Sequence, residues 1–171
     1  MVESVIDSVV INHFLRKSSP RGKRKSQKEL VPLVAIENAF KKRRLLVVVD
    51  KPRGIISEWE QTCGVEGVKQ LVIKWTDLSG FRLVQPAGLP AHAAKKLRKL
   101  GFNDVIDKLI VRCALRNGVH TTIVSIDSDF WDPSNPHRVG YANTPVAAFL
   151  RKSFGLTVQI TSTFLASLRA A

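Results

Sequence analysis

Short runs of apolar and β-branched residues recur along the chain, separated by stretches with helical spacing. The clearest run, "LLVVV" at residues 45–49, lacks polar alternation and is typical of a parallel strand buried on both faces. Three other runs have the length and composition of strands. The predicted strands are residues 2–7, 45–49, 119–126 and 156–160.

Helix signals fill the intervals between these runs. Ser26 and Glu29 form a capping box, but Pro32 conflicts with an unbroken helix, so this helix is expected to start later or kink and to run to Arg44. Residues 104–117, with Asn103 as the expected cap and Gly118 as the stop, have an apolar stripe at helical spacing. Residues 9–15 are a further candidate for a strand. The other predicted helices lie at residues 55–64, 89–100, 145–154 and 161–168.

Alternating strands and helices predict an α/β fold in which helices cover both faces of a parallel sheet. A length of 171 residues with 44% hydrophobic content suits a single domain over residues 1–171. In such sheets, ligands bind beyond the carboxyl ends of the strands.

The charge balance points to a polyanionic partner. Lys and Arg total 27 against 14 acids, a net charge of +13. A segment at residues 16–28 is basic without any acid, and its Ser, Pro and Gly content predicts a loop that contacts phosphates without stacking on bases. The predicted nucleic-acid-binding residues are Arg16, Lys17, Arg21, Lys23, Arg24, Lys25 and Lys28.

Several classes are disfavoured. Cys63 and Cys113 are far apart and predict free thiols in a reducing compartment, and the four histidines lack zinc-site spacing. Acids within the first apolar stretch argue against a signal peptide. No apolar run reaches the ~20 residues of a membrane span, so we expect a cytoplasmic protein without a membrane partner.

Carboxylates gather where strands are expected to end. Asp7, Asp50 and Asp127 lie at or near predicted carboxyl ends, Asp129 follows, and Asp107 lies near the start of a helix. Carboxylates brought together repel one another, and a divalent cation removes that cost. Oxygen ligands favour Mg²⁺ or Mn²⁺, which activate water for attack on a phosphodiester.

Five motifs, in order, resemble those of PIN domains: "VIDSVV", "IISEWE", "DKLIVRCAL", "IVSIDSDF" and "LTVQITSTFLASL". The resemblance spans almost the whole chain and implies a PIN-like three-layer sandwich with a central, mostly parallel sheet. It implies a metal-dependent nuclease, such as the family's many RNA-cleaving toxins, with a homodimer and an antitoxin as partners to consider. It assigns catalysis and metal binding to Asp7, Glu58, Asp107 and Asp127, with Asp129 assisting. Ser125 would orient the carboxylates of the fourth motif, "IVSIDSDF", or a metal-bound water.

Some alternatives stay open. The interval between Asp7 and Glu58 is longer than in small toxin members, so Asp50 or Glu60 could be the second acid. A DNA nuclease and a non-catalytic nucleic-acid binder are the competing functions, although no duplex-clamping segment is visible, which favours RNA. A phosphatase using the Asp127 and Asp129 pair lacks the further acids that this class needs. Asp104 is interpreted as a helix-start charge.

Overall fold

The computed structural model describes residues 1–16, 27–118 and 120–170. Their five strands form one sheet in the order β3-β2-β1-β4-β5, in which every pairing is parallel. The strands are β1 (Val2–Ile6), β2 (Leu45–Asp50), β3 (Phe81–Val84), β4 (Thr122–Val124) and β5 (Thr157–Gln159). The central strand is β1, so the residues that follow it emerge in the middle of the carboxyl edge.

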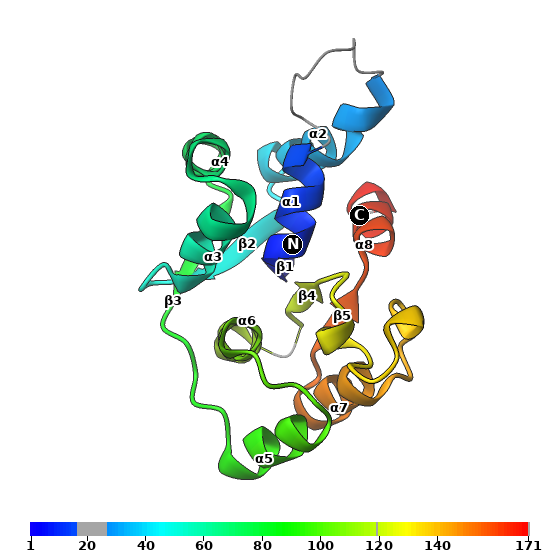
Figure 1. The fold of residues 1–171 in the computed structure, drawn as a ribbon. Helices are drawn as coiled ribbons and strands as arrows, with labels where there is room; N and C mark the ends of the chain where they lie inside the picture. The colour runs from blue at the N-terminus through cyan, green and yellow to red at the C-terminus, as the bar shows by residue number, and fades with distance from the viewer. Residues whose placement is uncertain (17–26, 119, 171) are drawn as a thin grey trace.

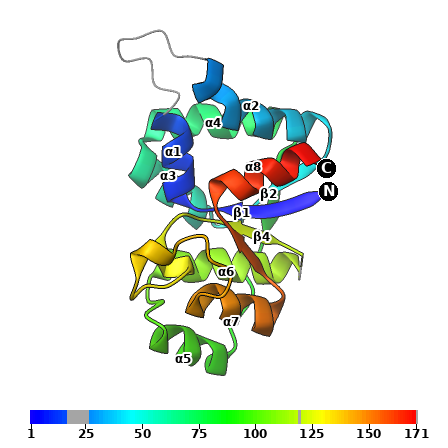
Figure 2. The same ribbon diagram turned by 90° about the vertical axis from the view of Figure 1, so that its right-hand side faces the viewer.

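Helices cover both faces of this sheet, as Figures 1 and 2 show, and the three-layer α/β sandwich is confirmed. Figure 2 shows α1, α2, α3, α4 and α8 on one side of the sheet and α5, α6 and α7 on the other. The helices are α1 (Ser8–Arg16), α2 (Gln27–Lys41), α3 (Gly54–Cys63), α4 (Val65–Asp77), α5 (Ala91–Lys99), α6 (Val105–Asn117), α7 (Pro145–Phe154) and α8 (Thr161–Ala170), with 3₁₀ turns at Ser128–Phe130 and Pro136–Arg138.

Aromatic side chains anchor the core on both faces. Trp75 makes edge contacts with Phe40 and Trp59, with ring centroids 5.3 and 6.3 Å apart. On the opposite side, Phe102 and Phe130 meet edge to face at 5.3 Å, which joins the segment before α6 to the turn after β4. Such contacts fix the helices that carry the acids relative to the strand ends.

The structure corrects several expected boundaries. The helix α2 continues through Pro32 and ends at Lys41 rather than Arg44, and residues 9–15 lie within α1. Asn103 does not cap α6; Asp104 does, accepting from the backbone N–H groups of Ile106 and Asp107. The carboxylate offers these donors a charged acceptor and favours the positive end of the helix dipole. The helix α4 and the strand β3 were not predicted from the sequence. Within the described ranges, no helix is long and apolar enough to cross a membrane.

Candidate acidic active site

Two neighbouring strands deliver acids to the middle of the carboxyl edge. In the register of β1 and β4, Ile6 is paired with Val124, and the backbone N–H of Asp7 donates to the carbonyl of Val124 at 3.0 Å. Asp7 follows β1 directly and is 4% exposed, whereas Asp127 follows β4 after two residues and is half-buried. The parallel pairing therefore brings together acids that are 120 residues apart in the chain.

Ser125 links these two acids. Its hydroxyl donates to Oδ2 of Asp7 at 2.5 Å and accepts from the backbone N–H of Asp127 at 2.9 Å. Ser125 is fully buried, so this connection is shielded from water. The hydroxyl fixes one oxygen of Asp7 and the chain direction at Asp127, so its carboxylate partner is Asp7 rather than an acid of its own motif, as the prediction had it.

Asp107 approaches from the first turn of α6 on the other side of the sheet edge. It is buried, and the surrounding charges act on its carboxyl. Burial, followed by the negative charges of Asp7, Asp104, Asp127 and Asp129, raises the pKa of Asp107 from 3.8 to about 8. No cation is among these causes.

The pKa values of Asp7 and Asp129 are raised for similar reasons. Burial raises the pKa of Asp7 to about 6, with the Asp127 charge adding to the rise and the Ser125 hydrogen bond opposing it. Burial and the charges of Asp127 and Asp104 also raise the pKa of Asp129. Oδ1 of Asp127 accepts from the backbone N–H of Asp129 at 3.0 Å, which closes the turn that presents both acids. We call Asp7, Asp107, Asp127 and Asp129 the acidic cluster.

Two buried tryptophans position the strand ends that carry the cluster. The indole N–H of Trp59 donates to the carbonyl of Ile6 at 3.1 Å, and that of Trp131 donates to the carbonyl of Ser125 at 3.2 Å. Both indoles thus satisfy backbone groups beside the cluster. The position of each tryptophan next to an acid, Trp59 after Glu58 and Trp131 before Asp132, was the available sequence signal for this role.

Asp50, the alternative second acid, has a different role. Its Oδ2 accepts from the backbone N–H of Gly54 at 2.8 Å and its Oδ1 from that of Ile55 at 2.9 Å. Both oxygens are therefore used to start α3. A Cβ on Gly54 would lie 2.8 Å from Leu109 Cδ2, so glycine permits the close approach of this turn to α6.

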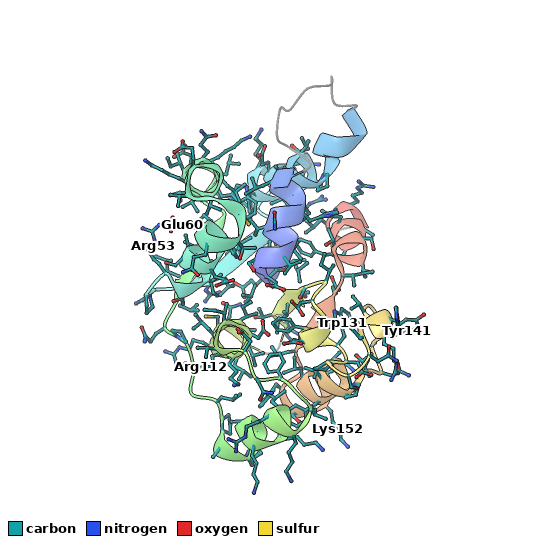
Figure 3. All side chains as sticks on the ribbon, viewed as in Figure 1. Arg53, Glu60, Arg112, Trp131, Tyr141 and Lys152 are labelled. Carbon is teal, nitrogen blue, oxygen red and sulfur yellow. The ribbon has the colours of Figure 1, made fainter. Side chains whose placement is uncertain are left out.

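The remaining candidates for a second acid lie on α3. Glu58 is half-buried and its carboxylate accepts from the Thr62 hydroxyl at 3.0 Å; it is not among the charges that raise the pKa of the cluster acids. Figure 3 shows Arg53 and Glu60 on the α3 side of the molecule, with Trp131 on the other side of α6. The structure thus brings together Asp7, Asp107, Asp127 and Asp129, and it does not link Glu58 to them.

Most of the predicted basic loop lies outside the described residues, including Lys17, Arg21, Lys23, Arg24 and Lys25. Arg16 ends α1, and Lys28 lies in the first turn of α2. Their predicted contacts with phosphate stay predictions.

The chemistry of the cluster fits a hard divalent cation. Its donors are carboxylate oxygens, and the raised pKa values of Asp7 and Asp107 reflect burial and a concentration of negative charge that a cation would relieve. Within the described residues, no group of three or more Asp, Glu, His or Cys side chains is placed so that it could hold a metal ion. The fit therefore rests on donor type and charge.

No protein-family model matches this chain, and neither a curated protein nor a solved structure was found to match it.

Proposed function

We propose that the protein is a metal-dependent nuclease that cleaves RNA at the acidic cluster. The proposal rests on the mutual repulsion of four carboxylates, which come from two strand ends and the start of one helix. No cation is among the causes of their pKa shifts. Within the described part of the chain, ion pairs involve other acids: Glu37, Glu3 and Asp132. Leaving buried acids unpaired costs stability, which is typical of a site kept for chemistry.

Asp7, Asp107 and Asp127 would hold Mg²⁺ or Mn²⁺, with Asp129 assisting. Such an ion, when bound, lowers the pKa of water and stabilises the charge that develops on a phosphodiester. In the hydrolysis, the water oxygen adds to phosphorus and gives up one proton, one bridging P–O bond breaks, and the departing oxygen takes up one proton, so that H₂O is added across the bond. Ser125 would hold Asp7 in place during this reaction, because its hydroxyl already donates to that carboxylate.

The charge of the rest of the chain supports a nucleic-acid substrate. The chain as a whole carries a net charge of +13, although four of its 14 acids gather in the acidic cluster. Basic residues at positions 16–28 would hold the phosphate backbone, whose negative charge the acids alone would repel. The positive surface recruits the polyanion, and the cluster acts on it.

The proposal is tested by incubating wild-type protein with end-labelled RNA and DNA panels, with and without Mn²⁺, and mapping the ends produced. We expect Mn²⁺-dependent internal cleavage of RNA and loss of cleavage in Asp127→Asn. Preferential cleavage of DNA would assign the chain to the DNA nucleases. Tight binding of RNA without cleavage by any metal-loaded preparation would favour a non-catalytic binder.

A further inference from the structure

A groove runs along the sheet edge at β3, on the face covered by α3 and α4. Its volume is about 400 Å³. The floor is formed by Val49 of β2 and by Phe81 and Leu83 of β3, which share a face because the parallel register pairs Val49 with Leu83. Side chains of α3 and α4, Ile56 and Val72, form the wall. The groove is large enough for one nucleoside-sized ring system.

Two exposed cations stand at the groove. Lys51 and Arg53 line it, and none of its lining residues is acidic. Neither cation takes part in an ion pair within the described residues. An apolar groove beside two unpaired cations complements a ligand that joins a flat, weakly polar ring to a phosphate.

The backbone holds Arg53 in a defined place. Arg53 has a left-handed conformation with φ of 64°, its N–H donates to the carbonyl of Asp50 at 3.0 Å, and its own carbonyl accepts from Ser57 at 2.9 Å. Non-glycine residues rarely adopt this conformation, and where they do, functional constraints are common. Figure 3 shows Arg53 projecting on the α3 side.

The cations lie at the same edge of the sheet as the acidic cluster. They directly follow β2, which pairs with β1, and β1 ends at the cluster residue Asp7. Adjacent strands are about 4.8 Å apart, so a strand of RNA that reaches one location extends easily to the other.

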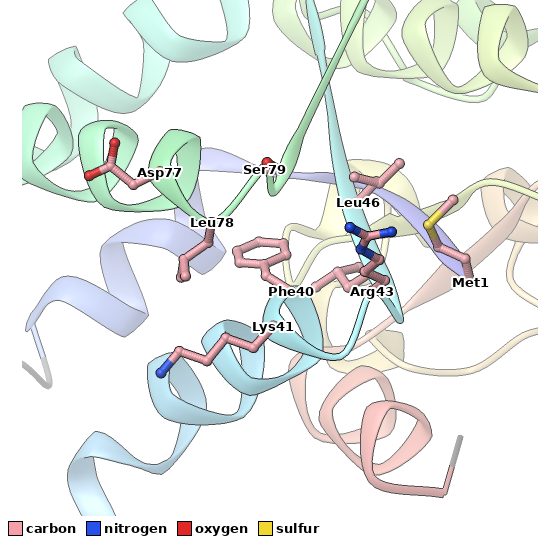
Figure 4. Close-up of a pocket in the computed structure, with 9 residues that line it drawn as sticks. Met1, Phe40, Lys41, Arg43, Leu46, Asp77, Leu78 and Ser79 are labelled. Carbon is pink, nitrogen blue, oxygen red and sulfur yellow. The ribbon is translucent and has the colours of Figure 1, made fainter.

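A second cavity lies toward the opposite, amino edge of the sheet; it also combines apolar and basic lining residues and shares Ser79 with the groove, but it includes an acid. Its volume is about 420 Å³, and its lining includes Asp77 together with Lys41 and Arg43 (Figure 4). It is separated from the acidic cluster by the length of the strands. It therefore supplies a location for control substitutions.

We propose that the β3 groove is a nucleotide subsite for single-stranded RNA, in which a base packs on Phe81 and Leu83 and its phosphate binds Lys51 and Arg53. The inference rests on the proposed nuclease function, because the same strand would continue to the acidic cluster. The groove would thus bind a base, whereas the basic segment at residues 16–28 is expected to contact only phosphates.

The test measures the affinity of a short fluorescein-labelled single-stranded RNA in EDTA, where cleavage is absent, across a range of salt concentrations. Lys51→Ala/Arg53→Ala is compared with Lys41→Ala/Lys42→Ala, which removes the same charge at the opposite edge. We expect the groove pair to weaken binding by about 10- to 100-fold. It should also lower the salt slope by about 1.4. The control pair should leave the slope unchanged.

Leu83→Ser tests the base contact, because Leu83 is 58% exposed and its substitution spares the core without adding a charge that would repel phosphate. It should weaken binding of RNA but not of an abasic strand with the same backbone. Equal effects of the groove and control pairs, or no effect of Leu83→Ser, would overturn the inference. If Lys51→Ala/Arg53→Ala left the affinity for RNA unchanged but abolished binding of an acidic peptide, the groove would be a peptide site and the inference would be wrong. Because binding is measured in EDTA, its result does not depend on cleavage. A protein without nuclease activity would contradict the proposed function but not the nucleotide subsite.

Discussion

Two buried acids at the carboxyl edge of the sheet, Asp50 and Asp107, have opposite surroundings. Asp50 is 1% exposed and both its oxygens accept backbone N–H groups at the start of α3. Asp107 is 9% exposed, no hydrogen bond to its carboxylate is seen within the described residues, and four other carboxylates oppose its ionisation. The first acid is satisfied by the fold, and the second is left without compensation.

The role of an acid at a strand end therefore depends on its hydrogen-bond donors and neighbouring charges rather than on its position in the chain. Backbone donors convert Asp50 into a helix cap, which is a structural role. Accumulated negative charge makes the acidic cluster unfavourable until a cation binds, which is the expected behaviour of a metal site. The following substitutions test that contrast from both sides.

The largest effect is expected from Asp127→Asn on catalysis. The amide preserves the shape and can still accept from the N–H of Asp129, but it removes a charge from the cluster. We expect cleavage of RNA to fall by ~10³-fold or more, measured as the single-turnover rate with Mn²⁺. Asp77→Asn, at the opposite edge of the sheet, is the control and should cleave like wild type. Equal rates for Asp127→Asn and wild type would remove the cluster from the mechanism.

Asp50→Ala should have the largest effect on folding. It leaves the N–H groups of Gly54 and Ile55 without their acceptor in a buried turn. We expect the free energy of unfolding to fall by about 2–3 kcal/mol in urea titrations. Asp50→Asn keeps one good acceptor and should lose less. If Asp50→Ala were as stable as wild type but inactive, Asp50 would belong to the catalytic set.

Asp107→Asn should do the reverse and stabilise the metal-free protein. The substitution removes a carboxyl that the folded protein must keep protonated at neutral pH, because burial and four neighbouring carboxylates raise its pKa to about 8. We expect a gain of about 1–2 kcal/mol in EDTA near neutral pH, together with loss of cleavage. A destabilised variant would show that Asp107 has a structural role like that of Asp50.

The gain from Asp107→Asn should depend on pH. The pKa of Asp107 is raised to about 8 in the folded protein from 3.8, so between these values the folded state retains a proton that the unfolded state releases. The free energy of unfolding of metal-free wild type should therefore fall as pH rises through this window, relative to the variant. Unfolding curves at several pH values in EDTA check this, and parallel pH profiles for the two proteins would contradict it.

The smallest effect is expected from Ser125→Ala. It removes the hydroxyl that donates to Asp7 and accepts from the N–H of Asp127. We expect a loss of about 1 kcal/mol of stability and a modest fall in cleavage rate, because the acids themselves remain. Ser125→Thr, which retains a hydroxyl, should restore part of the rate if the hydrogen bond is the cause.

Much of the fold followed from local sequence patterns. Continuous apolar runs predicted β1, β2, β4 and β5, although β4 covers only Thr122–Val124. The edge strand β3 was missed because "FRLV" is short and leaves Arg82 and Leu83 exposed, so it lacks a buried pattern. The helix α4 had a usable signal in the spacing of Val68, Leu71 and Trp75, all buried in the structure.

The sequence predicted which residue types form the site, but not which groups bond to each of these residues. Acids after strands pointed correctly to the carboxyl edge, where Asp7 and Asp127 meet. The bond from Ser125 to Asp7 joins residues 118 positions apart, which spacing alone does not specify. The capping role of Asp50 is local, within five residues, and the turn sequence "DKPRG" could have indicated it. The place of Glu58 depends on the rotation of α3 about its axis, which the motif leaves undetermined.

Direct binding of Mn²⁺ tests whether the acidic cluster holds a metal ion, and it does not require the substrate to be known. Isothermal titration calorimetry should detect binding to wild-type protein, with strong loss of affinity in Asp107→Asn and Asp127→Asn and none in Asp77→Asn. Each lost carboxylate removes a hard oxygen ligand and the charge that holds the ion. Equal Mn²⁺ affinity in wild type and both cluster variants would contradict the account and leave the acids as a purely electrostatic feature of the fold.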